Sequence, residues 1–293
     1  MIDSVTAPVV ETRPEYQRFS LQRLLGWSRE RSLMTGAIML IIILAASFLT
    51  SWFSPYTPIE QDLTNTLKPP SLAHPFGTDN FGRDIFTRVM VAAQLDLQIA
   101  FISILFPFAL GVVLGSLSGY LGGVVDALVM RTVDIISAFP FMVIVIAIIA
   151  MLGPGLESMY VALTLVVWRS YARIIRGEIL VLKKSDYVSA ARALSFSNLR
   201  IMFRHILPNV VTPAIVFAMS DVVLILLSTT SLSFLGLGVQ PPTAEWGNMV
   251  AEGRTYMITS WWLITFPGLA IVIVGIALSL FGDGLVNLLR TEG

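Results

Sequence analysis

The residues that could carry out chemistry are few and widely spaced. The chain has two histidines, His74 and His205, and no cysteine. The absence of cysteine excludes disulfides, thiol catalysis, iron–sulfur clusters and cysteine-ligated zinc. His74 lies close in sequence to Asp79 and Asp84, which leaves an ion site open beside the alternative of an ordinary structured loop. For His205, which lies among arginines, we expect hydrogen bonding or an interface role rather than catalysis.

No nucleotide-binding or hydrolase motif is present. The three lysines are Lys68, Lys183 and Lys184, and none follows a glycine, so the P-loop pattern G-x-x-x-x-G-K-[ST] is not matched. The patterns G-x-S-x-G and H-E-x-x-H are also missing, which leaves a membrane-bound hydrolase without a nucleophile–base set. We therefore predict no catalytic residue, no metal site and no cofactor on this chain. If nucleotide drives the protein, another chain hydrolyses it.

One carboxylate, Asp221, lies deep within a long apolar run. Ionisable residues inside a membrane are costly and are often functional. Asp221 could line a pathway or meet a cationic group of a substrate. The alternative is a capped or paired carboxylate at a helix break or near the membrane interface. A proton-relay transporter would be expected to carry more such residues.

The composition is that of a polytopic membrane protein. Hydrophobic residues make up 55% of the 293 residues and charged residues only 13%, against about 25% charged in soluble domains. The mean hydropathy is +0.79. Residues 1–33 are polar and arginine-bearing, and we expect a cytoplasmic segment there that could include an amphipathic surface helix or could be a solvated arm. No signal-peptide cleavage pattern precedes the first apolar run, so we predict that this run is retained.

The apolar runs predict an all-α protein with six transmembrane helices. A bilayer core needs about 20 apolar residues per helix. Gly111, Gly115 and Gly119 recur every four residues, which favours close packing of another helix on that stripe. Proline- and glycine-rich residues 54–96 form a long outer loop in this interpretation. The expected spans are 34–53, 97–121, 135–152, 158–175, 210–237 and 261–281.

The distribution of lysines and arginines supports the fourth span, whose apolar run is the shortest of the six. The apolar part of the fourth, 158–168, is short, and the span must borrow residues as far as 175. With six spans and both termini in the cytoplasm, only four of the nineteen lysines and arginines lie outside: Lys68, Arg83, Arg88 and Arg254. Without the fourth span, all the cations from Arg169 to Arg204 would also move outside, against the positive-inside rule.

The same topology places a polar stretch, DYVSAARALSFSNLRIMFRHILPN, in the cytoplasm within a loop over 177–208. Ser185 and Ser197 can each cap a short helix, and Pro208 ends the stretch. We expect one side of the first helix to hold Tyr187, Ala190, Ala191 and Leu194. Two short helices that carry exposed apolar side chains and arginines are suited to insertion into a groove on another protein. The alternative is a surface helix that binds only lipid headgroups.

This stretch resembles the cytoplasmic EAA loop of ATP-binding-cassette (ABC) importer permeases, most closely the C-type permeases of the peptide/nickel family. Further motifs of that family stand in the same order over nearly the whole chain. These are the runs HPFGTDNFGRD at 74–84, GYLGG at 119–123 followed by Asp126, Arg131 and Asp134, LSFLGLGVQPPTAEWG at 232–247 and FGDG at 281–284.

The resemblance implies a type I importer transmembrane domain over 34–289 in a bacterial inner membrane. Its partners would be a homologous second permease, two ATPase subunits that hold ATP and magnesium, an extracytoplasmic binding protein and the lipid bilayer, without nucleic acid. The substrate could be a dipeptide, an oligopeptide, glutathione, an opine or a metal chelate. The alternative function is a self-sufficient channel or secondary transporter.

The resemblance also implies roles for particular residues. Ser189 stands where the family usually has glutamate, and Ser195 where it has glycine; a capped serine turn could replace the positive-φ glycine. The residues expected to couple to the ATPases are Ser189, Ala190, Ala191, Arg192, Ser195 and Pro208. The residues expected to contact the binding protein are Asp79, Arg83, Asp84 and Trp246.

Overall fold

The structure, a computed structural model, describes residues 31–289, and these residues are almost entirely helical. The proposed amphipathic segment lies outside the described residues except for the first residues of α1. Within 31–289 the only β pairing is an isolated bridge between Thr78 and Asp84. The α-helices are α1 (Arg31–Phe53), α2 (Ile85–Leu121), α3 (Gly123–Ser137), α4 (Phe141–Leu152), α5 (Leu156–Leu182), α6 (Asp186–Ala193), α7 (Asn198–Arg200), α8 (Leu207–Phe234), α9 (Trp246–Gly253) and α10 (Trp262–Leu289). Short turns of other types are the 3₁₀ helices η2 (Leu63–Asn65) and η4 (Arg254–Tyr256) and the π-helix η3 (Ile201–Ile206).

Four helical stretches are long and apolar enough to cross a membrane: α1, α2, α10 and the continuous stretch 198–234 that ends with α8. Helices α3 and α4 meet at 95° and count as a fifth if the bent pair is one span. The predicted count of six is therefore not reproduced as such. The third predicted span is broken because Pro140 lacks a donor and disfavours helical geometry in the residue before it. Helix α5 has 27 residues but carries several charges.

Two of the boundary shifts have a clear local cause. Helix α2 begins at Ile85, because the Asp84 carboxylate accepts a hydrogen bond from the Thr87 amide at 2.8 Å and caps it. The outer loop therefore ends at Asp84 rather than near residue 96. Before the fifth predicted span, the helix does not stop at Pro208. The π-turn η3 runs directly into α8, and Pro208 lies in the first turn of α8, where a missing donor costs little.

The glycine stripe packs as predicted. A Cβ at Gly111 would lie 2.7 Å from the Trp168 carbonyl oxygen, and one at Gly115 would lie 2.6 Å from the Ala172 carbonyl oxygen. A Cβ at Gly119 would meet Ile179 at 3.0 Å. These approaches bring the backbones of α2 and α5 into contact, and this pair forms the most extensive helix–helix packing in the described chain.

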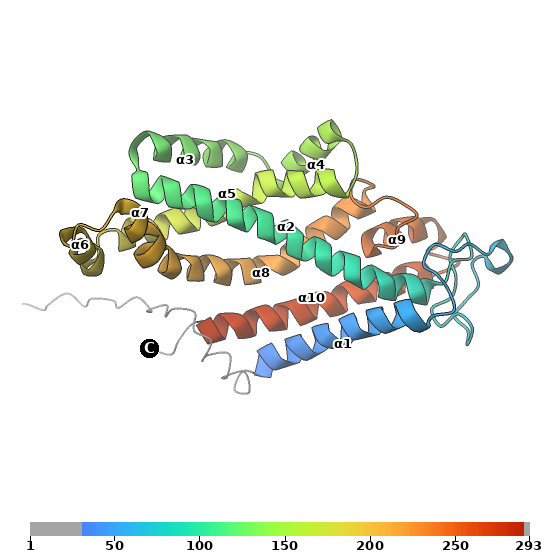
Figure 1. Cartoon of the computed structure of the whole chain (residues 1–293). Helices are drawn as coiled ribbons and strands as arrows, with labels where there is room; N and C mark the ends of the chain where they lie inside the picture. The colour runs from blue at the N-terminus through green and yellow to red at the C-terminus, as the bar shows by residue number, and fades with distance from the viewer. Residues whose placement is uncertain (1–30, 290–293) are drawn as a thin grey trace, which may run out of the picture.

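The long helices run between two different ends of the molecule. Figure 1 shows α6 and α7 at one end and the loop after α1 at the other, close to α9. The N-terminal end of α1 and the C-terminal end of α10 lie toward the α6 end. This arrangement separates the two regions that sequence analysis expects on opposite sides of the membrane.

Candidate functional site

The short helix α6 divides its side chains between an inner and an outer face. Val188 is fully buried and Ala191 is 5% exposed, and both belong to an apolar cluster with Ile201 and Ile206. Tyr187 points outward. Leu194 is also exposed, as are Ser189, Ala190 and Arg192. The expectation that Ala191 shares an outer face with Tyr187, Ala190 and Leu194 is therefore wrong. Val188, three residues before Ala191, is the helical-spacing signal that sequence analysis missed.

The turn after α6 is a Schellman motif with serine in the position that favours glycine. Ser195 has φ +58°. The Phe196 amide donates to the Ala191 carbonyl at 3.2 Å, and the Ser195 amide donates to the Arg192 carbonyl at 2.9 Å. Serine thus adopts the left-handed conformation itself, so the expected replacement by a different, capped turn is wrong.

The two predicted serine caps behave differently. The Ser197 hydroxyl accepts a hydrogen bond from the Arg200 amide at 3.4 Å and caps α7 as expected. The Ser185 hydroxyl instead donates to the Leu182 carbonyl at 2.7 Å, so it makes no side-chain cap for α6. Ser185 occupies the cap position through its extended backbone alone.

The region from the end of α5 to α7 is fixed to the end of α2 by polar contacts that the sequence did not reveal. The Tyr120 hydroxyl donates to the Asn198 side chain at 2.9 Å, and the Lys183 ammonium donates to the Tyr120 carbonyl at 2.5 Å. On α5, Arg176 forms a two-point ion pair with Asp126 of α3 at 2.5 and 2.7 Å. These contacts tie α7 and the end of α5 to the end of α2, and they tie α5 to α3.

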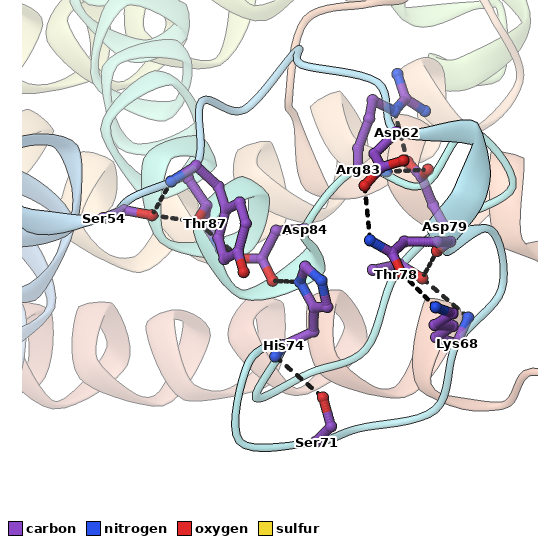
Figure 2. A network of polar contacts seen from close by, with 12 residues as sticks. Ser54, Asp62, Lys68, Ser71, His74, Thr78, Asp79, Arg83, Asp84 and Thr87 are labelled. Atoms are coloured by element: carbon purple, nitrogen blue, oxygen red, sulfur yellow. Dashed lines mark hydrogen bonds and ion pairs between the residues drawn. The ribbon is translucent and has the colours of Figure 1, made fainter.

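The outer motif forms a buried polar network (Figure 2). The Arg83 side chain donates to Asp79 at 2.5 Å and to Glu252 at 2.8 Å. Asp79, Arg83 and Asp84 are 3%, 1% and 3% exposed. The network holds the residues before α2 against α9 across more than 160 positions of sequence.

Burial changes the expected role of these residues. Trp246, 1% exposed, donates its indole N–H to the Val89 carbonyl at 2.9 Å. Asp79, Arg83, Asp84 and Trp246 therefore have almost no surface for direct contact with another protein, and they shape the outer surface from within. The possible ion site also fails: His74 meets Asp84 at 3.0 Å, but Asp79 is paired with Arg83. No three-residue metal-ligand group is found within 31–289.

Two further carboxylates in this region were missed. Asp96 lies within α2 and is 2% exposed, and it accepts a hydrogen bond from the Trp246 amide at 3.2 Å. Glu245 caps α9 by accepting from the amides of Gly247 and Asn248 at 2.9 and 2.7 Å. Burial raises the pKa of the Glu245 carboxyl. In the exposed part of the loop, the Thr64 hydroxyl lowers the pKa of Asp62 by hydrogen bonding to its carboxylate.

Asp221 is half-buried on α8 and lines a cavity of about 270 Å³ that Arg169 and Ser170 of α5 also line. Its carboxylate accepts a hydrogen bond from the Tyr171 hydroxyl at 3.3 Å. The sequence singled out Asp221 but not Arg169. Asp221 is not the only acid inside a span, since Asp96 also lies within α2.

Comparison with known families identifies this architecture. Residues 111–291 match the family described as the binding-protein-dependent transport system inner membrane component. The chain belongs to this family. Residues 27–70 also match the N-terminal transmembrane domain of oligopeptide transport permease C. The permease is therefore an ABC transport subunit, and ATP is hydrolysed on separate ATPase subunits.

Relatives and solved structures agree with this assignment. The permease is 39% identical to the glutathione transport system permease protein GsiD of Escherichia coli O6:K15:H31, over 88% of this chain and 85% of the relative. It is 38% identical to the dipeptide transport system permease protein DppC of Alkalihalophilus pseudofirmus, over 85% and 83%. The fold is similar to a chain of the inward-facing MetNI methionine ABC transporter, with a TM-score of 0.56 and 19% identity over 71% of this chain and 98% of that one.

These findings support a transport subunit over a self-sufficient channel or secondary transporter. The permease has no cofactor of its own, as is general in this family, because nucleotide binding belongs to the ATPase subunits. It is a multi-pass protein of the inner membrane. A transporter of this family in general combines such a permease with a partner permease, ATPases and a binding protein.

Proposed function

We propose that this permease forms half of the import pathway for small peptides or related solutes and couples to two ATPase subunits through α6 and α7. The observation that carries the proposal is the outer face of α6. Tyr187 and Leu194 are 42% and 69% exposed, and Leu199 on α7 is 68% exposed, although the inner faces of these elements are well packed. An ordered, exposed apolar surface with cations beside it suits a protein groove.

The proposed orientation places α6 and α7 in the cytoplasm. Arg192, Arg200 and Arg204 lie in or next to these short helices. The other end of the molecule holds few cations, and Arg83 there is already paired with Asp79 and Glu252. The positive-inside rule therefore favours a cytoplasmic location for α6 and for both termini. A homologous second permease would complete the pathway, and a binding protein would deliver solute to the opposite, outer end.

The solute class rests on the relatives. One is named for dipeptides and another for glutathione. Both solutes are small peptides with a free amino group and free carboxylates. We infer that this permease handles solutes of the same class.

The test is ATP-driven uptake of labelled peptides by proteoliposomes that contain the permease, its partner permease, both ATPases and the binding protein. Ala190→Glu puts a charge on the exposed face of α6 without entering the core. We expect uptake to fall by more than about tenfold, which corresponds to 1.4 kcal/mol of lost coupling. Ser189→Glu is the matched control, because it adds the same charge at the neighbouring position where the family usually has glutamate.

Two results would contradict the proposal. Full uptake by Ala190→Glu would show that α6 does not dock through this face. Uptake by the permease alone, in liposomes without ATPase subunits, would remove the need for coupling altogether.

A further inference from the structure

Three arginines follow one another along one side of α5, and two of them have carboxylate partners on α3. Arg176 pairs closely with Asp126, and Arg173 lies 3.8 Å from Asp134. Arg169 is the next in the series and has no ion pair among residues 31–289. Its described hydrogen bond is to the Val166 carbonyl of its own helix, at 3.3 Å. Helix α3 thus neutralises two charges of the series and leaves the third.

Asp221 on α8 is likewise a charged side chain without an ion-pair partner among the described residues. A single tyrosine hydroxyl at 3.3 Å is a weak substitute for water around a carboxylate. An ionisable side chain within a membrane bundle needs a partner or a wet cavity. Asp221 and Arg169 line the same cavity, yet they do not pair with each other.

The other residues that line the cavity suit a small polar ligand. Its other polar lining residues are Ser170 on α5 and Ser228 on α8, and Phe141 at the start of α4 forms part of the wall. The Ser228 hydroxyl donates to the Leu224 carbonyl at 2.7 Å, so it needs no further acceptor. The two groups whose charge is unmatched are therefore Arg169 and Asp221, one of each sign. A ligand that meets both must itself carry an anionic and a cationic group, as a carboxylate and an ammonium provide.

We propose that Arg169 and Asp221 form a binding site for a small zwitterion, with the solute carboxylate on the guanidinium and the solute ammonium on the carboxylate. This inference rests on the proposed import of small peptides, whose free termini provide these two charges. Planar guanidinium groups bind carboxylates through paired hydrogen bonds, which gives orientation as well as attraction. The site would thus orient a peptide as it passes between α5 and α8.

The natural absence of cysteine in this chain allows a direct test. Ser170→Cys and Ser228→Cys each put a single thiol in the cavity of the permease, within its complex with the partner permease and ATPases. Each is labelled with a neutral methanethiosulfonate and quantified on this chain by mass spectrometry. We expect a panel of zwitterions, dialanine and trialanine, to slow labelling several-fold. N-acetyl-dialanine amide, which lacks both charges, should not protect.

Substitutions then assign the two ends. In the unsubstituted complex, dialanine amide, which keeps only the ammonium, and N-acetyl-dialanine, which keeps only the carboxylate, should each protect more weakly than dialanine. Asp221→Asn should abolish protection by dialanine amide, and Arg169→Gln should abolish protection by N-acetyl-dialanine. Arg173→Gln is the matched control, because it removes an arginine one turn along α5 whose partner is the exposed Asp134, and protection should persist. Equal protection by charged and blocked peptides, or protection by neither, would overturn the site. ATP-driven uptake by the unsubstituted complex is measured in parallel, so a failure of import is distinguished from a failure of this site.

Discussion

At the scale of single residues, the most informative position is Ser195. A left-handed backbone costs a non-glycine residue roughly 1–2 kcal/mol, yet Ser195 adopts φ +58° between α6 and α7. The two Schellman hydrogen bonds and the burial of Ala191 and Val188 against the following π-turn hold it there. The shape of the loop is therefore set by its packing and not by the identity of the turn residue.

This leads to a prediction for the turn. Ser195→Gly should leave uptake and loop stability nearly unchanged, because relief of backbone strain is offset by the greater freedom of glycine in the unfolded chain. Ser195→Val should destabilise the loop by more than about 1 kcal/mol, because a β-branched residue is strongly disfavoured at positive φ. Hydrogen exchange of the α6 and α7 amides measures both. Equal protection in the two variants would contradict the φ assignment.

The neighbouring alanines Ala190 and Ala191 differ in burial, since Ala190 is exposed and Ala191 is buried. Ala191→Glu should loosen α6 itself, because the new charge enters an apolar cluster with no partner. Ala190→Glu, on the exposed face, should leave the exchange of the α6 amides unchanged while it reduces uptake. Hydrogen exchange and uptake measured on both variants distinguish loss of folding from loss of docking; increased exchange in Ala190→Glu would show that the two faces are assigned incorrectly.

At the scale of elements, the contact between α2 and α5 organises the bundle. Three glycines at intervals of four let the two helices touch through their backbones. Helix α5 is the least apolar of the long helices, so the bilayer alone does not place it. Its packing on α2 and its ion pairs with α3 fix its position, with Arg176 and Asp126 partly buried and Arg173 and Asp134 exposed.

Gly115→Ala should disrupt this contact. The added methyl group would lie 2.6 Å from the Ala172 carbonyl oxygen and 2.9 Å from its Cα, so the helices must separate, at about 1–3 kcal/mol. Gly177→Ala, on α5 with nothing within 4 Å, is the matched control and should be neutral or slightly stabilising. Thermal unfolding in detergent compares them; a Gly115→Ala variant as stable as Gly177→Ala would refute close backbone packing.

The outer loop depends on Arg83. Arg83→Met removes the closer of the two arginines that Asp79 and Glu252 share and leaves only Arg88, at 3.9 Å from Asp79 and 3.5 Å from Glu252. Leaving a buried charge without any partner costs about 3–5 kcal/mol, and because Arg88 remains we expect a loss below that range. We expect the residues between α1 and α2 to become sensitive to limited proteolysis. Arg254→Met, at an exposed arginine of the same end, should leave the digestion pattern unchanged; a resistant Arg83→Met would show that the network is not needed for the loop.

At the scale of the whole molecule, two chemically different ends lie apart. One end is the loop between α1 and α2 and the other is the loop of α6 and α7 (Figure 1). The first is held by buried acids and arginines, and the second has an exposed apolar face. In the proposed function, the helices that run between them would carry a movement from one end to the other. The proposed site at Arg169 and Asp221 lies on two of these helices, α5 and α8.

The orientation of the ends can be measured with single cysteines, because the chain has none. Leu72→Cys lies in the outer loop and Leu199→Cys on α7, both strongly exposed. A membrane-impermeant maleimide should label Leu72→Cys in intact spheroplasts and Leu199→Cys only after the membrane is opened. The reverse pattern would invert the topology, and labelling of both from outside would show that the two ends share one side.

Much of this protein could be predicted from local patterns in its sequence. Apolar runs identified a helical membrane protein, the missing P-loop meant that any nucleotide hydrolysis had to occur on another chain, and the order of motifs identified the family. The glycine spacing predicted the packing stripe of α2 correctly. These features can be predicted from the sequence because each depends on residues close together in the chain or on composition.

The tertiary structure decided what depends on distant partners. It divided α6 so that Ala191 faces inward, because the π-turn after α7 covers that side. It buried Arg83 in an ion pair with Glu252, which lies far along the chain. It also brought Arg169 of α5 and Asp221 of α8 into the lining of one cavity. No local pattern encodes such pairings, because the burial and charge balance of a side chain are set by whichever helix packs against it.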